Sequence, residues 1–276
     1  MAKRDIIHKL QDYRDLSWNE KTATSGTGGT FLKARRKTSR GDIYYKLSCY
    51  DRYEGVYGHE SVNELIASRL LDQLNIPHVP YKLVHAQVEI NGQVHETWLS
   101  ESRDYRRSNE RRQALDTYID LNAQGNEDPL EFCKKMGWKK AIEEMMAFDY
   151  LIINRDRHGA NVEVILRDGT IELAPLFDHG VSLAYSCYTD EDRITSFDPF
   201  YNGRVNNYLG SRSLENNLSL VSKDVLQGRI LTDKGRSLFL GLDDVISRSL
   251  KDKLWEIIST RWQHLVNLGI AKERDQ

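Results

Sequence analysis

The chain of 276 residues contains few cysteines and prolines, and it has no excess of charge of either sign. Its three cysteines, Cys49, Cys133 and Cys187, are too few and too scattered for a disulfide framework or a zinc site. Lys and Arg number 39 against 41 Asp and Glu, which argues against a dedicated nucleic-acid-binding protein, since such proteins are usually basic. With 18 glycines and 5 prolines, the chain is not a fibrous or low-complexity protein.

Long apolar runs are also absent from the sequence. No stretch approaches the ~18 apolar residues that a membrane-spanning helix needs. The charged first eight residues lack the apolar centre of a secretory signal. We therefore expect a cytoplasmic protein without a membrane partner. Hydrophobic residues make up 39% of the chain, and this length allows one large domain or two lobes that share a cleft.

Residues 1–101 have the pattern of a β-rich lobe with one helix. Apolar residues recur at helical spacing from Glu60 to Asn75, and Pro77 follows the end of this helix. The basic residues 35–37 are expected in a loop between two strands of a hairpin. Other β-branched and aromatic runs predict strands at 42–48, 79–83, 87–90 and 94–99, with a type I′ turn at Asn91-Gly92.

Residues 102–276 have a mostly helical pattern. A charged connector at 101–112 contains five arginines, which we interpret as a solvated face or as a surface that steers an acidic substrate; they are Arg103, Arg106, Arg107, Arg111 and Arg112. Helices are predicted at 129–136, 139–153 and 242–268, and a β-hairpin at 161–183. The sequence thus predicts an α+β fold with two lobes, a β-rich N-lobe over 1–101 and a mostly helical C-lobe over 102–276.

One segment carries the side chains for chemistry. An apolar helix is followed by a loop rich in Asp, Arg and His that ends at Asn161, and then by two β-rich runs joined by Asp168-Gly169. Asp-Gly between two such runs is a strong hairpin pattern. A hairpin returns its far end to its start, so Asn161 and Asp178 are expected side by side. Two such oxygen ligands suit Mg²⁺, which takes few protein ligands and completes its shell with phosphate and water.

The spacing within this segment is that of a kinase. Asp156 lies five residues before Asn161 (161 − 156 = 5). In protein kinases the catalytic loop has the same spacing, with the aspartate accepting the proton of the substrate hydroxyl and the asparagine binding metal. Asp178-His-Gly180 stands where a kinase has the metal-binding aspartate of its D-F-G motif. The combined pattern predicts a kinase.

The motifs also resemble one family. Arg155-Asp156-Arg-His158-x-x-Asn161 and Pro175-Leu-Phe-Asp178-x-Gly180-x-Ser182 resemble the catalytic and metal-binding segment of the HipA-like Ser/Thr kinases, which include bacterial toxin kinases. The Asp-Arg-His-x-x-Asn core is similar to that of phosphoinositide 3/4-kinases, which share the two-lobed protein-kinase-like fold. The chain departs from HipA in being too short for its extra N-terminal subdomain, and in having Ala160 where a lysine usually precedes the metal asparagine.

The resemblance implies a role for each polar residue of the two lobes. Asp156 is the catalytic residue, and Asn161 and Asp178 hold Mg²⁺. Lys46 contacts the α- and β-phosphates of ATP, and a glutamate of the helix at 60–75 pairs with it. The resemblance favours Glu64 for this pair, and Glu60, one turn earlier on nearly the same face, is the competing choice.

Two further residues of the loop are expected to support it. The resemblance favours a structural role for His158, which would hydrogen-bond the backbone of the loop rather than bind metal. Arg155 is expected to orient the same loop through an ion pair.

The nucleotide is expected to meet the N-lobe at two places. A glycine-rich loop lets the backbone approach phosphates closely, and here it comprises Ser25, Gly26, Thr27, Gly28 and Gly29. Glu101 occupies the hinge position, where backbone groups would hold adenine. HipA-like kinases are often regulated by phosphorylation in the glycine-rich loop, so we expect autophosphorylation at Ser25 or a neighbour such as Thr27.

The sequence therefore predicts an ATP-dependent Ser/Thr protein kinase of the HipA-like type, with ATP and Mg²⁺ as cofactors. The resemblance implies a toxin with an antitoxin partner, and a protein substrate such as a translation factor or an aminoacyl-tRNA synthetase. Direct nucleic-acid binding is not expected. Two alternatives stay open: a lipid or small-molecule kinase on the same fold, and a catalytically silent nucleotide-binding interaction module.

Overall fold

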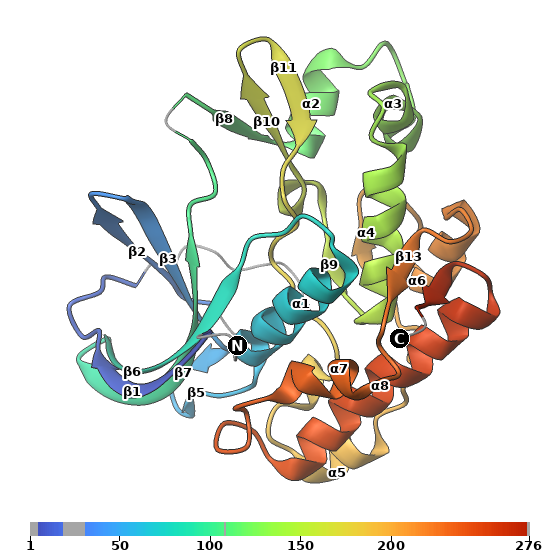
Figure 1. Ribbon diagram of the computed structural model, residues 1–276. Coiled ribbons are helices and arrows are strands. Elements are labelled where there is room, and N and C mark those ends of the chain that lie inside the picture. The colour runs from blue at the N-terminus through green and yellow to red at the C-terminus, as the bar shows by residue number, and fades with distance from the viewer. Residues whose placement is uncertain (1–4, 19–30, 108, 275–276) are drawn as a thin grey trace.

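The computed structural model describes residues 5–18, 31–107 and 109–274. It confirms the predicted α+β fold, with a sheet on one side and most of the helices on the other (Figure 1). Helix α1 (Glu60–Leu74) lies between these two parts, where it contacts the sheet through β6 and β7. A boundary between two lobes at residues 101 and 102 stays a prediction, because strand β7 continues through that position to Arg103.

The main sheet has five strands in the order β1-β6-β7-β3-β2. Neighbouring strands are antiparallel except for β1, which pairs parallel with β6 at one edge. The predicted turn at Asn91-Gly92 is confirmed, since both residues have the positive φ angles that a type I′ turn requires. The strands are β1 (Ile6–Asp12), β2 (Lys33–Thr38), β3 (Gly41–Leu47), β6 (Tyr81–Ile90) and β7 (Gln93–Arg103).

The expected basic loop at residues 35–37 is wrong, because these residues lie within β2 and pair with β3. Because β2 is an edge strand of the sheet, the charged side chains of these residues reach solvent without disturbing the hydrogen bonds between β2 and β3. The turn of this hairpin falls instead at Ser39-Arg40, between β2 and β3.

Helix α1 joins the sheet to the helical part of the molecule. Its apolar residues recur at 62, 65, 66 and 70 and are buried, as the sequence pattern predicts. The helix ends at Asn75, whose left-handed φ of 55° terminates it two residues before Pro77. One apolar cluster runs from α1 into α4 and α8, so the position of α1 is fixed from both sides.

The helical part is built around α4 and α8. The helices predicted at 139–153 and 242–268 are both confirmed. Residues 242–247 are not helical, however, because Ser247 caps the N-terminus of α8 by accepting a hydrogen bond from the backbone N–H of Leu250. Among the described residues, no helix is long and apolar enough to cross a membrane. The helices after α1 are α2 (Leu115–Asn122), α3 (Pro129–Lys135), α4 (Lys139–Leu151), α5 (Glu191–Ser196), α6 (Leu214–Asn217), α7 (Asp233–Arg236) and α8 (Arg248–Asn267).

The predicted hairpin is formed by β10 (Glu163–Arg167) and β11 (Thr170–Leu173). Asp168 and Gly169 at its turn both have positive φ, as expected for Asp-Gly. The expected connector is partly wrong: its last residues form β8 (Arg111–Ala114), which adds a third strand to this hairpin (Figure 1). The remaining short strands are β4 (Tyr50–Asp51), β5 (Gly55–Val56), β9 (Asp156–Arg157), β12 (Asn206–Asn207), β13 (Leu226–Gly228) and β14 (Ala271–Glu273).

Candidate active site

A pocket of about 430 Å³ lies between the main sheet and the three-stranded β8–β10–β11 sheet. Strands β2, β3 and β7 contribute one wall, and the segment from His158 to Glu163 contributes the opposite wall. Its apolar lining residues include Val79 and Phe177, and its charged residues come from both walls. The charged lining residues are Lys33, Lys46, Arg103, Asp104, Arg112, Glu163 and Asp178.

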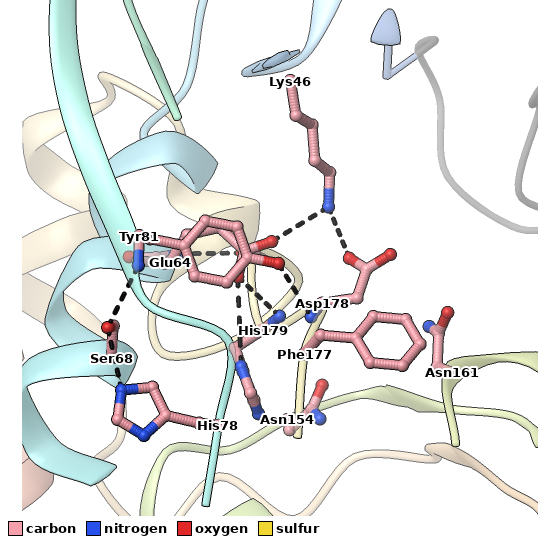
Figure 2. Close-up of polar contacts among 12 residues, drawn as sticks. Lys46, Glu64, Ser68, His78, Tyr81, Asn154, Asn161, Phe177, Asp178 and His179 are labelled. Atoms are coloured by element: carbon pink, nitrogen blue, oxygen red, sulfur yellow. Dashed lines mark hydrogen bonds and ion pairs between the residues drawn. The ribbon is translucent and has the colours of Figure 1, made fainter. Parts of the chain in front are cut away.

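The inner end of the pocket holds the predicted lysine between two carboxylates. Lys46 Nζ lies 3.1 Å from Glu64 Oε1 and also contacts Asp178 Oδ1 (Figure 2). Strand β3 brings the lysine, α1 brings Glu64, and the segment after β11 brings Asp178. The structure therefore brings three of the predicted site residues together. Along the chain, Glu64 is 18 residues from Lys46 and Asp178 is 132 residues from it.

The charges of this cluster support one another. Burial by itself would lower the pKa of Lys46, but the carboxylates of Asp178 and Glu64 outweigh it and raise that pKa. Burial would likewise raise the pKa of Asp178, but Lys46 and Lys33 outweigh it and lower that pKa. Both groups therefore stay ionised at neutral pH.

Lys33 was not predicted from the sequence. Its Nζ lies 3.5 Å from Asp178 Oδ2, and its side chain lines the pocket. It lies in β2, directly opposite Lys46 in the register of β2 and β3. The sequence did contain one indication, since Lys33 follows the predicted glycine-rich loop.

Glu60 does not form the pair with Lys46. One oxygen of its buried carboxyl accepts a hydrogen bond from the backbone N–H of Cys49 at 3.2 Å. Burial raises the pKa of Glu60 to about 7. The geometry therefore assigns the ion pair to Glu64 and leaves Glu60 as a buried carboxyl with a separate environment.

This environment predicts a pH-dependent stability. The folded protein holds a proton on Glu60 that the unfolded chain releases above its ordinary pKa of 4.5, so stability falls between pH 4.5 and about 7 and then levels off. We expect Glu60→Gln to remove this fall, so that the variant gains on the order of 3 kcal/mol relative to wild type between pH 4.5 and 8. Urea unfolding of both proteins across that range measures the difference. A constant difference at every pH would contradict the prediction.

Asp156 lies beside the pocket, at the start of a short loop. Its backbone carbonyl accepts a hydrogen bond from Asn161 Nδ2 at 2.9 Å, which links the two predicted residues directly. Asn206 Nδ2 donates to Asp156 Oδ1 at 3.2 Å from the parallel bridge of β9 and β12. Asp156 does not itself line the pocket, whereas Asn161 does.

His158 has the structural role that the resemblance favoured. Its Nδ1 accepts a hydrogen bond from the backbone N–H of Ala160 at 3.2 Å and so caps the 3₁₀ turn Gly159–Asn161. Arg155 differs from the expectation: among the described residues it makes no ion pair, and its guanidinium packs over the rings of Tyr185 and Tyr201 at 4.9 and 4.3 Å.

Arg157 is a second residue of the site to which the sequence analysis assigned no role. It is 1% exposed and forms a buried pair with Asp149 of α4, with Nη2 at 2.9 Å from Oδ1. Its Nη1 also donates to the carbonyl of Asn161 at 2.9 Å and to the carbonyl of Phe177 at 3.0 Å. One guanidinium thus fixes the loop of Asp156 against the residue before Asp178. An arginine inside the motif was visible in the sequence, but its distant carbonyl partners were not.

The pocket suits Mg²⁺ by the chemistry of its donors. The side-chain nitrogen of Asn161 donates to the backbone carbonyl of Asp156, so the side-chain oxygen of Asn161 is the atom available to bind a metal. Asp178 provides a carboxylate in the same pocket. The described residues contain no cluster of three or more His, Cys, Asp or Glu side chains able to hold a metal. One carboxylate and one amide oxygen nevertheless fit Mg²⁺, which usually takes few protein ligands and shares the phosphates of its nucleotide.

Two of the predicted nucleotide contacts stay predictions. The glycine-rich loop, with Ser25, Gly26, Thr27, Gly28 and Gly29, lies outside the described residues. Glu101 lies in β7, between β3 and β6, and does not line the pocket, although Ser100, Ser102 and Arg103 beside it do. A nucleotide contact by Glu101 stays a prediction.

Comparison with known proteins supports the fold. The structure of a Helicobacter pylori proinflammatory kinase, CtkA, aligns with a TM-score of 0.58 at 14% identity, over 94% of this chain and 96% of that one. A Shewanella oneidensis MR-1 structure of the toxin–antitoxin proteins HipA and HipB with operator DNA aligns with a TM-score of 0.48 at 15% identity, over 90% and 67%. No protein-family description and no curated protein matches the chain.

The match to CtkA shows that this chain has a kinase-like fold along nearly its whole length. The kinase-like fold that the motifs predicted is therefore confirmed.

Proposed function

We propose that this protein is an ATP-dependent kinase that transfers the γ-phosphoryl group to a serine or threonine of a protein. The observation that carries the proposal is the cluster of Lys46, Glu64 and Asp178, of which Glu64 is fully buried and the other two are mostly buried, in a pocket that Asn161 also lines. In kinases a fixed lysine binds the phosphates of the nucleoside triphosphate, and a neighbouring carboxylate binds the metal ion.

The residues of the pocket divide the work of the transfer. Lys46, held by Glu64, provides a positive charge for the α- and β-phosphates, and Lys33 provides a second one at the mouth of the pocket. Asn161 and Asp178 would hold Mg²⁺, which when bound neutralises charge on the phosphates. The rate enhancement then comes mainly from positioning and electrostatic stabilisation.

Asp156 is the proposed base of the reaction. The hydroxyl oxygen of the substrate forms a bond to the γ-phosphorus while the bond from that phosphorus to the β,γ-bridging oxygen breaks. The hydroxyl proton passes to the Asp156 carboxylate, and ADP leaves with the bridging oxygen. Asn206 donates to Oδ1 of Asp156 at 3.2 Å, and His158 Nε2 lies 3.8 Å from Oδ2, which we propose accepts the proton of the substrate hydroxyl.

The class of substrate is tested by labelled transfer. The protein is incubated with Mg²⁺ and γ-labelled ATP, either with cell-lysate proteins or with vesicles containing phosphatidylinositol. We expect label on serine or threonine of protein and none on lipid. Label confined to the lipid would favour the lipid kinase instead, and label in neither arm would favour the catalytically silent module. Mass spectrometry of the labelled protein identifies the substrate.

Autophosphorylation at Ser25 or Thr27 belongs to the same proposal. A phosphate there adds about two negative charges where the phosphates of ATP are expected, and so opposes nucleotide binding. The antitoxin partner and a translation-related substrate rest on the motif resemblance alone, and the cytoplasmic location rests on the lack of a secretory or membrane-spanning pattern in the sequence; all three stay predictions.

A further inference from the structure

Tyr81 contacts the proposed metal-binding segment, although no sequence pattern indicated a role for it. It is the first residue of β6, and its side chain lines the pocket. Its hydroxyl accepts a hydrogen bond from the backbone N–H of Asp178 at 3.3 Å, and the two residues are 97 positions apart (Figure 2). A side chain of the main sheet is therefore bound to the main chain of the aspartate proposed to hold Mg²⁺.

The next peptide is held from the same side. The backbone N–H of His179 donates to Glu64 Oε2 at 2.8 Å. Two consecutive N–H groups, those of Asp178 and His179, thus bind side chains that come from β6 and α1. These bonds hold Asp178 at a φ of 58°, a left-handed conformation that is uncommon for residues other than glycine. Without such anchors the backbone of Asp178 would relax toward more common angles.

Tyr81 is itself tied to α1. Its backbone N–H donates to Ser68 Oγ at 3.2 Å, and His78 Nε2 lies 3.1 Å from the same oxygen. Ser68 follows Glu64 by four residues (68 − 64 = 4), so both lie on one face of the helix. Helix α1 therefore reaches the Asp178–His179 peptide by two routes, directly through Glu64 and indirectly through Ser68 and Tyr81.

We propose that Tyr81 is a positioning residue that sets the conformation of Asp178 for Mg²⁺-dependent nucleotide binding and couples it to the position of α1. This inference rests on the proposed function, because it concerns how the proposed metal ligand is held.

The protonation of Tyr81 is consistent with this role. Burial, with the nearby carboxylates of Glu64 and Asp178, raises the pKa of its hydroxyl well above the ordinary value. The hydroxyl therefore stays neutral at physiological pH, so that it accepts from the Asp178 N–H without adding a negative charge beside that carboxylate.

The test removes only this hydroxyl. In Tyr81→Phe we expect amide exchange at Asp178 to accelerate roughly three- to tenfold, since one hydrogen bond is lost. We also expect the Mg²⁺ concentration that half-saturates binding of the ATP analogue AMP-PNP to rise by a similar factor, while affinity at saturating Mg²⁺ changes little. Hydrogen exchange followed by NMR and calorimetric titration measure the two effects.

The matched control is Tyr118→Phe, which removes a hydroxyl from a buried tyrosine that packs on Phe132 and Trp138, away from the pocket. Neither quantity should change in it. Unchanged Asp178 exchange in Tyr81→Phe, an equal change in the control, or faster exchange with an unaltered Mg²⁺ dependence would each overturn the proposal. If wild type binds no AMP-PNP with Mg²⁺, the proposed function fails, and the exchange measurement alone then decides whether Tyr81 holds Asp178.

Discussion

Replacement of Asp178 with alanine is expected to reduce Mg²⁺-dependent nucleotide binding by at least about a hundredfold and to abolish transfer. The variant loses the carboxylate that Lys46 and Lys33 hold in the pocket, and Asn161 remains as a single proposed ligand. Lys46 keeps its partner Glu64, so its charge remains compensated. Calorimetric titration of AMP-PNP with and without Mg²⁺ measures the loss.

The control for this variant is Asp244→Ala, because Asp244 is exposed and lies outside the site. It should bind and transfer like wild type. Circular dichroism of Asp178→Ala establishes that the fold persists. Retention of Mg²⁺-dependent binding within threefold of wild type would show that Asp178 does not hold the metal.

Removal of the Arg157 side chain is expected to have the largest effect on stability. Arg157→Ala leaves the carboxylate of Asp149 buried without its cation, and it leaves the carbonyls of Asn161 and Phe177 without this donor. Loss of one partner of a buried ion pair costs about 3–5 kcal/mol. For a chain of this size we expect Tm to fall by roughly 6–20 °C in thermal unfolding.

Two comparisons separate this effect from a general cost of removing arginine. Arg248→Ala removes an arginine whose side chain is 90% exposed, in a pair with Asp252, and should change stability by less than about 0.5 kcal/mol. The double variant Arg157→Met/Asp149→Asn should be more stable than Arg157→Ala, since no buried charge is left alone. A loss below about 1 kcal/mol in Arg157→Ala would show that the buried pair does not hold the loop together.

The parts of the fold that sequence patterns predicted are local. Helix α1, the turn at Asn91-Gly92 and the turn at Asp168-Gly169 each follow from residues within a few positions of one another. The hairpin prediction extended this reasoning to the site, since it placed Asn161 and Asp178 at the two ends of one supersecondary unit. Both residues line the same pocket.

The parts that sequence patterns missed depend on distant contacts. Strand β1 pairs parallel with β6, about 75 residues away in the chain, and no local pattern indicates such a partner. Residues 35–37 form a strand because β3 provides a ladder, which overrides their charge. Arg157, Lys33 and Tyr81 acquire their roles only when segments far apart in sequence close the pocket.

The choice between Glu60 and Glu64 also needed the structure. Both residues are buried on α1, four positions apart (64 − 60 = 4), so helical spacing alone does not distinguish them. Which glutamate pairs with Lys46 depends on how β3 packs against α1, and this packing is a property of the tertiary structure. Glu64 contacts both the lysine and the His179 backbone, whereas Glu60 contacts the backbone of Cys49.

The most direct test of a kinase reaction at this site is a paired measurement on Asp156→Asn, which keeps the size of the residue and one oxygen that can accept from Asn206, but removes the proposed base. Nucleotide binding is measured by titration of AMP-PNP with Mg²⁺, and transfer by single-turnover labelling of protein with γ-labelled ATP. We expect binding within about threefold of wild type and transfer reduced at least about a hundredfold, the range typical of a lost general base. Transfer by Asp156→Asn at the wild-type rate, with binding equally unchanged, would contradict the assignment of this pocket as the active site.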